Sequence, residues 1–448
     1  MTLRSIVWFR RDLRLHDHPA IQRAARDGRH VLPLFVIDPA LVNPSGAVRL
    51  AFLYRSLRAL NASLDGRLVV RHGEPERVVA ELAAEVSAGE VVVSRDYAPY
   101  GRARDLRVGE ALRALDVELI GAGSPYAVAP GTVVKADGSP YSVFTPFYRA
   151  WLARGWPEPS SSPPVEWCAA GTVASEEIPV DPRIDADLPR AGEDAAHQRW
   201  VEFLEDGISR YATDRNNPAQ PGTSRLSPYL RWGQLHPRQL LADIERTDDS
   251  GAGPSTYRKE LAWREFYADV LFHQPRSARE NLQQRMDGIA TDSDEAARAR
   301  FERWVSGTTG FGIIDAGMRE LLATGWMHNR VRMITASFLV KDLHLPWQWG
   351  ARHFMRHLVD GDLASNQHGW QWSAGTGTDA APYFRVLNPN LQSERFDPDG
   401  EYIRRWVPER RGLVGAAVHR PSNPIVDHAA ERAEALQRYG AVSGRYPR

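Results

Sequence analysis

The run Val31-Leu-Pro-Leu-Phe-Val-Ile37 is the longest of five short apolar runs in the first 125 residues, and these runs decide the fold of this half of the chain. Segments 47–62 and 74–88 lie between the runs and carry apolar residues at helical spacing. Strands that alternate with helices form a parallel sheet with helices on both faces. Residues 1–130 are therefore predicted to be a doubly wound α/β domain. The other four runs are Ile6-Val-Trp-Phe9, Leu68-Val-Val-Arg71, Val91-Val-Val-Ser94 and Val117-Glu-Leu-Ile120.

The second half of the chain has a different pattern. With 448 residues the chain is long enough for two domains. Around residues 155–192 it becomes rich in Pro, Ser, Gly and acidic residues, which do not sustain helix or strand periodicity. After Glu193 nearly every segment has helical spacing, for example 195–207, 257–272 and 330–342. We expect a linker over residues 131–192 and an all-helical C-terminal domain over residues 193–448.

Composition excludes several classes of protein. Hydrophobic residues make up 43% and charged residues 25%, as in soluble globular proteins. The single cysteine, Cys168, excludes an internal disulfide framework and a four-cysteine metal site, and no metal site is predicted. No apolar run approaches the roughly 20 residues that span a bilayer, and charges such as Arg10 and Asp12 interrupt any signal peptide. We expect a cytoplasmic protein without a membrane partner.

Lys and Arg together number 56, and so do Asp and Glu, so the net charge gives no indication of a polyanionic partner. A local basic groove remains compatible with this balance.

Tryptophans are concentrated near the C-terminal end of the chain. The stretch from Gly325 to Asn390 holds five of the 14 tryptophans around the run Asp360-Gly-Asp-Leu-Ala-Ser-Asn366. Any one of these indoles is best explained as a core residue. Carboxylates and an amide among them are unusual for a plain core, and an aromatic wall with a few polar groups suits a planar ligand. A flavin or a stacked base is the predicted ligand. The five are Trp326, Trp347, Trp349, Trp370 and Trp372.

Three shorter motifs add polar groups. Gly222-Thr-Ser-Arg-Leu-Ser-Pro228 could hold phosphate on hydroxyls and a helix start, although an ordinary helix cap with a surface Arg explains it equally well. Glu260, Trp263 and Arg264 share one helix face, as a simple ion pair or as a base-stacking site. The run 326–333, Trp-Met-His-Asn-Arg-Val-Arg-Met, likewise combines an aromatic ring with an amide and two guanidinium groups.

Taken together, these residues resemble the photolyase and cryptochrome family, and specifically class I cyclobutane pyrimidine dimer photolyases. The resemblance covers nearly the whole chain, beginning with Val7-Trp-Phe-Arg-Arg-Asp-Leu-Arg-Leu-His-Asp17 and densest from Thr309 to Asn388. It implies an N-terminal α/β antenna domain, a linker, and a helical domain that holds FAD in a U-shaped conformation. It also implies a monomer that acts on DNA.

The resemblance implies which residues would line the FAD. Asn366 would face flavin N5, where a neutral amide can donate or accept, and Arg332 paired with Asp360 would tune the charge nearby. Plant and animal cryptochromes tend to carry Asp or Cys at the position of Asn366. The implied cofactor-binding residues are Tyr211, Thr223, Ser224, Arg225, Leu226, Ser227, Tyr257, Arg264, Asn329, Arg332, Asp360, Asp362 and Asn366.

The resemblance also implies residues for the lesion. Light-driven electron transfer from reduced FAD would open a pyrimidine dimer flipped out of the duplex, and Glu260 would stabilise the charge that develops on it. Paired histidines are typical of relatives that repair 6-4 photoproducts, whereas this chain has His328-Asn329 and Met333, so the cyclobutane dimer is the predicted substrate. The implied DNA and lesion contacts are Arg215, Glu260, Trp263, Asn329, Arg330, Met333 and Trp372.

The chain departs from the family pattern at two places. Trp370 and Trp347 match the inner and middle members of a three-tryptophan electron route, but the outer position falls on Asp294, and the electron could leave by Trp304, Trp349 or a tyrosine. Gly101 stands where folate-binding relatives carry Glu. A deazaflavin antenna is therefore preferred over folate, with a second flavin or an empty pocket as the other possibilities.

The main alternative from another class is a cryptochrome-type blue-light sensor that binds FAD without repairing DNA. Asn366 argues against it, as does the set Glu260, Trp263 and Met333. A DNA-binding flavoprotein without catalytic activity is a third possibility, which the neutral net charge disfavours.

Overall fold

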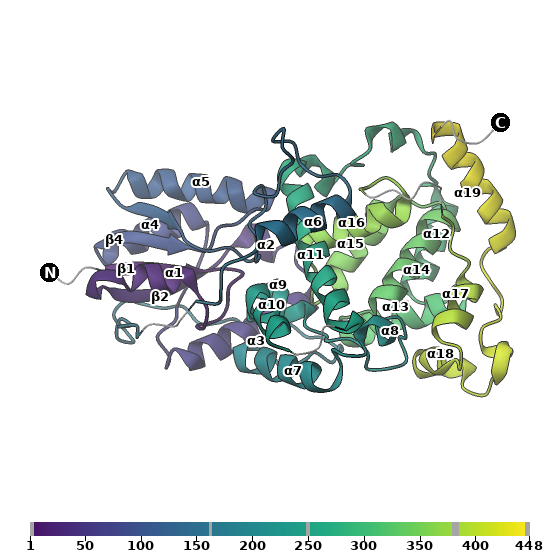
Figure 1. Cartoon of the computed structure of the whole chain (residues 1–448), viewed down its shortest axis with the longest axis horizontal. Helices are drawn as coiled ribbons and strands as arrows, with labels where there is room; N and C mark the ends of the chain where they lie inside the picture. Colours follow the sequence, from purple (N-terminus) through teal and green to yellow (C-terminus); the bar gives the residue numbers. More distant parts are fainter. Residues whose placement is uncertain (1–3, 161–163, 248–250, 379–384, 444–448) are drawn as a thin grey trace.

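A five-stranded parallel sheet forms the N-terminal half of the computed structural model, which describes residues 4–160, 164–247, 251–378 and 385–443 (Figure 1). The strands are β1 (Arg4–Phe9), β2 (His30–Ile37), β3 (Val69–His72), β4 (Ala88–Val93) and β5 (Glu118–Gly121), in the order β3-β2-β1-β4-β5. The order reverses between β1 and β4, as in doubly wound folds. The five apolar runs of the sequence become these five strands, so the predicted α/β domain is confirmed.

Helices cover both faces of the sheet. One apolar core contains Ile6, Trp8, Leu34 and Val91 together with α4 (Pro75–Glu85) and α5 (Pro99–Arg113). The opposite core contains Val7, Phe9 and Phe35 with α1 (Pro19–Ala24) and α3 (Ala47–Ser63). Alternate residues of one strand thus face opposite layers, as the two-residue repeat of a strand requires. The short helix α2 (Pro39–Val42) follows β2.

The segment predicted as a linker contains a helix that packs into the core. In α6 (Phe144–Arg154), Phe144, Phe147 and Trp151 are buried. Trp151 donates its indole N–H to Glu265, whose carboxylate also accepts the backbone N–H groups of Ala127 and Val128 at 2.6 and 3.0 Å. This part of the predicted linker therefore packs firmly on α11, because the aromatic residues that α6 carries at helical spacing are buried there. The domain boundaries at residues 130 and 192 stay a prediction.

The C-terminal half is helical, as predicted, and forms the right-hand part of Figure 1. The long helix α11 (Ala252–His273) lies against α16 (Leu363–Ala374), which also packs on α14 (Asn329–Lys341) and α15 (Trp347–His357). No helix in the described part of the chain is long and apolar enough to cross a membrane. The other helices are α7 (Glu193–Asp206), α8 (Tyr211–Asp214), α9 (Ser227–Trp232), α10 (Pro237–Arg246), α12 (Glu295–Val305), α13 (Gly312–Thr324), α17 (Pro389–Phe396), α18 (Glu401–Trp406) and α19 (His428–Ser443).

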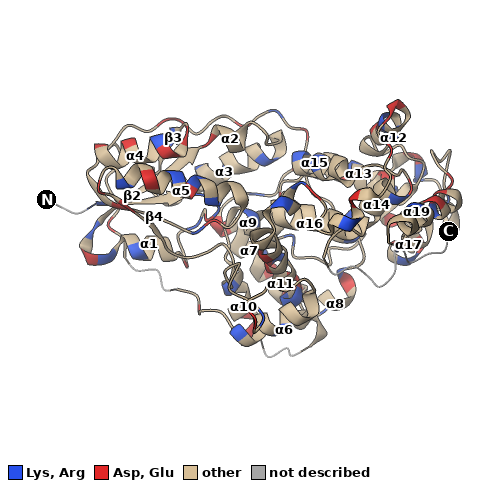
Figure 2. Ribbon diagram, turned by 90° about the horizontal axis from the view of Figure 1, so that it is seen from above, with Lys and Arg blue, Asp and Glu red and all other residues tan. Residues whose placement is uncertain are grey.

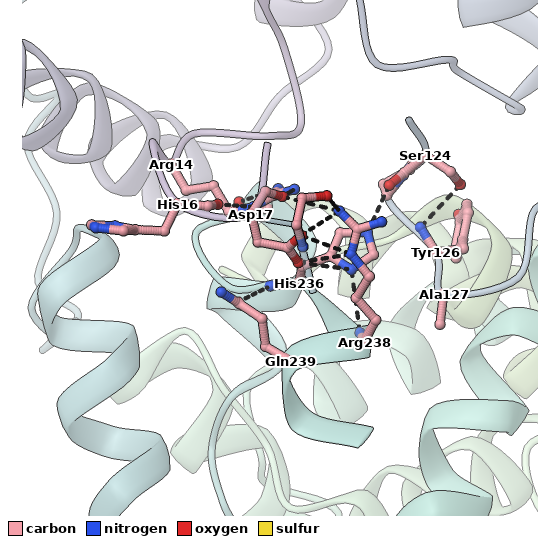
Figure 3. Close-up of polar contacts among 12 residues, drawn as sticks. Arg14, His16, Asp17, Ser124, Tyr126, Ala127, His236, Arg238 and Gln239 are labelled. Carbon is pink, nitrogen blue, oxygen red and sulfur yellow. Dashed lines mark hydrogen bonds and ion pairs between the residues drawn. The ribbon is translucent and has the colours of Figure 1, made fainter. Parts of the chain in front are cut away.

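A buried ion pair joins the two halves. Asp17, just before α1, accepts two 2.8 Å hydrogen bonds from Nε of Arg238 at the start of α10 (Figure 3). It also accepts the backbone N–H of Ser160. His236 Nε2 lies 2.8 Å from the carbonyl oxygen of Ser124. Gly233 is required beside this junction, because it has φ +66° and a Cβ there would lie 2.0 Å from the carbonyl oxygen of Arg11. Polar contacts therefore fix the sheet against the helices that carry the site.

Candidate functional site

One cavity collects most of the residues that the sequence singled out. It has a volume of about 560 Å³, within the range of small-molecule sites, and lies between α8, α9, α11, α14 and α16. Of the predicted residues, those lining it are Tyr211, Arg215, Ser224, Ser227, Tyr257, Glu260, Trp263, Arg264, Asn329, Arg330, Arg332, Met333, Asp360, Asp362, Asn366, Trp370 and Trp372.

Four of the residues that the resemblance assigned to the site do not line this cavity, and neither do Trp326 and Trp349 of the predicted aromatic wall. Arg225 is exposed and lies over the ring of Trp326 at 4.5 Å, with a left-handed φ of 52°. Leu226 is buried in the core, and the carbonyl oxygen of Thr223 accepts a hydrogen bond from Arg199. Trp347 lines a second cavity of about 160 Å³ instead. Ser224 and Ser227 are thus the residues of this motif that line the main cavity.

A carboxylate among three arginines dominates the charge of the cavity wall. Asp362 caps α16 by accepting the N–H of Ser365 at 3.0 Å and pairs with Arg11 from the α/β half at 2.5 Å. Burial alone would raise the pKa of this carboxyl, but the positive charges of Arg11, Arg231 and Arg264 hold it well below its usual range. Asp362 is therefore ionised at neutral pH, and it links the two halves of the chain at the site.

Three buried polar atoms in the wall have no partner among the described residues, and the first is Nε of Arg330. Asp360 pairs with Arg332 through Oδ2 at 2.8 Å, while its Oδ1 is buried and unbonded. Arg231 donates from Nε to the carbonyl oxygen of Gly361, while its Nη1 is buried and unbonded. Burial, followed by the charge of Arg11, lowers the pKa of Arg231 to about 9. Buried polar atoms are normally bonded, so this donor and this acceptor fit a polar ligand such as FAD.

The amide of Asn366 is fixed in place. Its Nδ2 donates to the carbonyl oxygen of Ala351 at 3.1 Å and to Oε1 of Gln367 at 2.8 Å. These bonds use the nitrogen, so the amide oxygen is left for a group in the cavity. In this orientation Asn366 can only accept a hydrogen bond from the cavity, and its role beside flavin N5 stays a prediction.

Two tyrosines form an aromatic corner of the cavity. Tyr211 on α8 and Tyr257 on α11 meet edge-on at 5.1 Å, and the hydroxyl of Tyr257 donates to Ser224 at 3.0 Å. Burial raises the pKa of both phenols well above the ordinary value. The two rings are therefore neutral hydrogen-bonding walls and not bases.

The predicted lesion residues lie together on the same cavity. Glu260 accepts a hydrogen bond from Arg215 at 2.6 Å, so Arg215 contacts this carboxylate, and its predicted role as a DNA contact stays a prediction. Trp263 stacks on Phe144 of α6, with ring centres 3.7 Å apart and planes 8° from parallel. Arg330 lies over the ring of Phe396 and bonds to Asn216. The segment predicted as linker thus supports a residue of the site.

Trp370 forms part of the cavity wall because Gly350 leaves room for it. A Cβ at Gly350 on α15 would lie 2.1 Å from Cη2 of the Trp370 indole. We expect Gly350→Ala to push the indole toward the cavity, to cost about 1–3 kcal/mol of stability, and to lower the FAD content of the purified protein. Thermal melting and flavin absorbance measure both effects. Gly412→Ala is the control, because its Cβ would meet nothing within 4 Å; equal behaviour of the two variants would contradict the prediction.

Some residues of the cavity were not predicted from the sequence. Arg231 follows Ser227 by four residues on α9, so helical spacing from a predicted residue was a signal for it. Tyr267 and Phe354 gave no signal, because single aromatic residues on helices are usually core residues.

Comparisons with known proteins agree with this geometry. A family model described as the FAD binding domain of DNA photolyase matches residues 257–441, and one described as DNA photolyase matches residues 5–165. The deoxyribodipyrimidine photo-lyase of Escherichia coli (strain K12) is 39% identical over 98% of this chain and 98% of its own. The chain therefore belongs to the DNA photolyase family, and its helical half carries the FAD-binding domain of that family.

Solved structures of similar fold include proteins of two kinds. A bacterial class III photolyase from Agrobacterium tumefaciens has a TM-score of 0.91 and 36% identity, covering 99% of this chain and 98% of its own. A cryptochrome from Synechocystis sp. PCC6803 has a TM-score of 0.89 and 27% identity, covering 98% and 99%. A photolyase and a cryptochrome are thus both among its structural relatives, and the particular activity has to be argued from the site.

Proposed function

We propose that this protein is a light-driven photolyase that repairs cyclobutane pyrimidine dimers in DNA with FAD as cofactor. The observation that carries the proposal is the composition of the main cavity. Asp360, Asp362 and Asn366 line it, and so does the set Glu260, Trp263, Met333 and Trp372 that the family resemblance assigns to the lesion. A sensor without repair would not need the second set beside the first.

The side chains of the cavity have separate tasks in this proposal. Arg332, Arg231 and the hydroxyls of Ser224 and Ser227 would bind the cofactor through charge and hydrogen bonds. Bound and fully reduced, FAD would supply one electron to the dimer after absorbing light and take it back when the cyclobutane bonds have opened.

The lesion would be held by the remaining side chains. Trp263, backed by Phe144, and Trp372 provide apolar walls for a flipped dimer, which leaves the stack more easily than a normal pair. Glu260, oriented by Arg215, would bind the polar edge of the dimer. Figure 2 shows basic and acidic residues spread over the whole molecule, so DNA contact depends on local arginines such as Arg330 and Arg395 near the cavity and not on the net charge.

Three finer points belong to the same proposal. We place the chain with class I enzymes on its motifs, although one of its near structural relatives is named class III. A deazaflavin is preferred over folate as antenna because Gly101 stands where folate-binding relatives carry Glu. The protein would act as a cytoplasmic monomer.

The direct test is a repair assay. The purified protein is loaded with FAD, reduced with dithionite, mixed with an oligothymidine carrying cyclobutane dimers, and illuminated with blue light. Recovery of thymine absorbance in the light and not in the dark is the expected result. Absence of recovery with FAD bound and reduced would favour the blue-light sensor.

A carboxylate is expected to matter at position 260. Because charge on the dimer develops only after electron transfer, a group that stabilises it acts on the yield of repair and less on binding. We expect Glu260→Ala to lower the repair yield per absorbed photon several-fold, while Glu205→Ala, on an exposed position of α7, leaves it unchanged. An unchanged yield for Glu260→Ala would remove Glu260 from the mechanism.

A further inference from the structure

A line of aromatic rings runs from the main cavity to the surface. Trp370 lines the cavity and meets Trp304 of α12 edge-on, with ring centres 6.0 Å apart. Trp304 is fully buried and stacks on Phe301 at 5.8 Å. Phe301 meets Trp349 of α15 edge-on at 5.4 Å, and Trp349 is partly exposed. The rings connect the cavity with solvent without a gap.

The chemistry of these rings suits electron transfer. Indole is oxidised far more easily than a phenyl ring, so the tryptophans would hold the charge and Phe301 would be a spacer. Trp304 donates its Nε1–H to the carbonyl oxygen of Thr335 at 3.1 Å. A carbonyl oxygen is too weak a base to remove the proton of an oxidised indole, and Trp304 is shielded from water. A positive charge on Trp304 would therefore stay mobile and pass on to Trp349.

The branch through Trp347 is less continuous. Its Nε1 donates to Asn281 at 2.8 Å, and its ring lines the second cavity with His344 and Arg438. Among the described residues, no ring–ring contact joins Trp347 to Trp370. Asp294, at the position expected for an outer tryptophan, is the N-cap of α12 and accepts the N–H of Ala297 at 2.8 Å. The position expected for the outer tryptophan therefore holds a helix cap and not an aromatic ring.

We propose that Trp304 and Trp349 carry electrons to the flavin when oxidised FAD is excited by light, replacing a route through Trp347. The inference rests on the proposed function only in requiring FAD against Trp370. An electron passes from Trp370 to the flavin, from Trp304 to Trp370 and from Trp349 to Trp304. A thiol in solution then reduces Trp349. Over two turnovers, two thiols become one disulfide and release two electrons and two protons; the flavin takes both electrons and one proton, and the other proton goes to solvent.

The test measures reduction of the flavin and oxidation of the tryptophans separately. Protein with oxidised FAD is illuminated with blue light and dithiothreitol, and the loss of the oxidised flavin band is timed. We expect Trp349→Phe to slow the loss several-fold and Trp349→Tyr, which keeps an oxidisable ring, to restore part of the rate. Trp406→Phe is the matched control: Trp406 is a partly buried tryptophan of the same helical half, in no ring contact among the described residues. FAD content is measured for every variant.

Peptide mapping gives a second readout that does not depend on flavin spectra. Without thiol, dissolved oxygen traps the oxidised indole, and oxidation is expected to accumulate on Trp349 in the wild-type protein under light. A Trp349→Phe protein that is reduced at the wild-type rate, or a Trp347→Phe protein that is slowed more, would overturn the proposal. Repair by dithionite-reduced wild-type protein bypasses this route, so failure of the repair proposal and failure of the relay are read in different assays.

Discussion

Replacing Asp362 by alanine is expected to lower the free energy of unfolding by about 3–5 kcal/mol and to leave the protein largely without FAD. The carboxylate is largely buried, with 11% of its side chain exposed; it pairs with Arg11 at 2.5 Å and caps α16. Its removal leaves Arg11, Arg231 and Arg264 facing one another without a counter-charge, and breaking a buried pair costs more than the pair contributes. Thermal melting and the flavin content of the purified variant measure the two effects.

Two variants distinguish the effect of the Asp362 charge from the effect of its helix cap. Asp362→Asn keeps a good N-cap but removes the charge, whereas Asp294→Ala removes a cap that has no arginine cluster around it. We expect Asp362→Asn to lose nearly as much unfolding free energy as Asp362→Ala. Asp294→Ala should lose only about 1 kcal/mol. Equal losses for Asp294→Ala and Asp362→Ala would mean that capping, and not charge, explains the effect.

The lowered pKa of Asp362 also leads us to expect that stability depends on pH. Its folded-state pKa lies below the unfolded value, so its contribution to stability is complete above the unfolded pKa of about 4 and is lost as the pH falls through the folded one. Wild-type protein should therefore lose stability on acidification below about pH 4, and Asp362→Asn should lose less over the same range. Parallel curves for the two proteins would contradict this.

The sheet could be predicted from sequence because β1, β2 and β4 each contain an uninterrupted apolar run. The main site could be predicted because its polar residues lie in a few short motifs. The docking of α6 could not, since Phe144 and Trp151 find their partners on α11, more than 100 residues away. The contact between Arg215 and Glu260 is likewise a product of helix packing. Trp304 was recognised only as one possible exit, because nothing local in the sequence shows that α12 brings it against Trp370.

Truncating Trp263 to alanine is expected to weaken binding of dimer-containing DNA by about 10- to 100-fold, the equivalent of about 1–3 kcal/mol for one stacked base. Trp263 lines the cavity, and its indole is held flat on Phe144, so the wall is in place before a lesion enters. A preformed surface needs no ordering when the ligand binds, which increases the affinity it provides. Fluorescence anisotropy with labelled duplexes, with and without a dimer, measures the change.

The expected loss of affinity is limited to damaged DNA, and the controls test this selectivity. Undamaged duplex does not place a flipped base in the cavity, so its weak binding through surface arginines should be the same for wild type and Trp263→Ala. Trp263→Phe keeps an apolar ring against Phe144 and should retain most of the affinity for damaged DNA. Phe144→Ala leaves Trp263 present but unsupported, and we expect an intermediate loss. If Trp263→Ala weakened damaged and undamaged duplex equally, the indole would contact DNA outside the cavity, and the lesion site would have to be placed elsewhere.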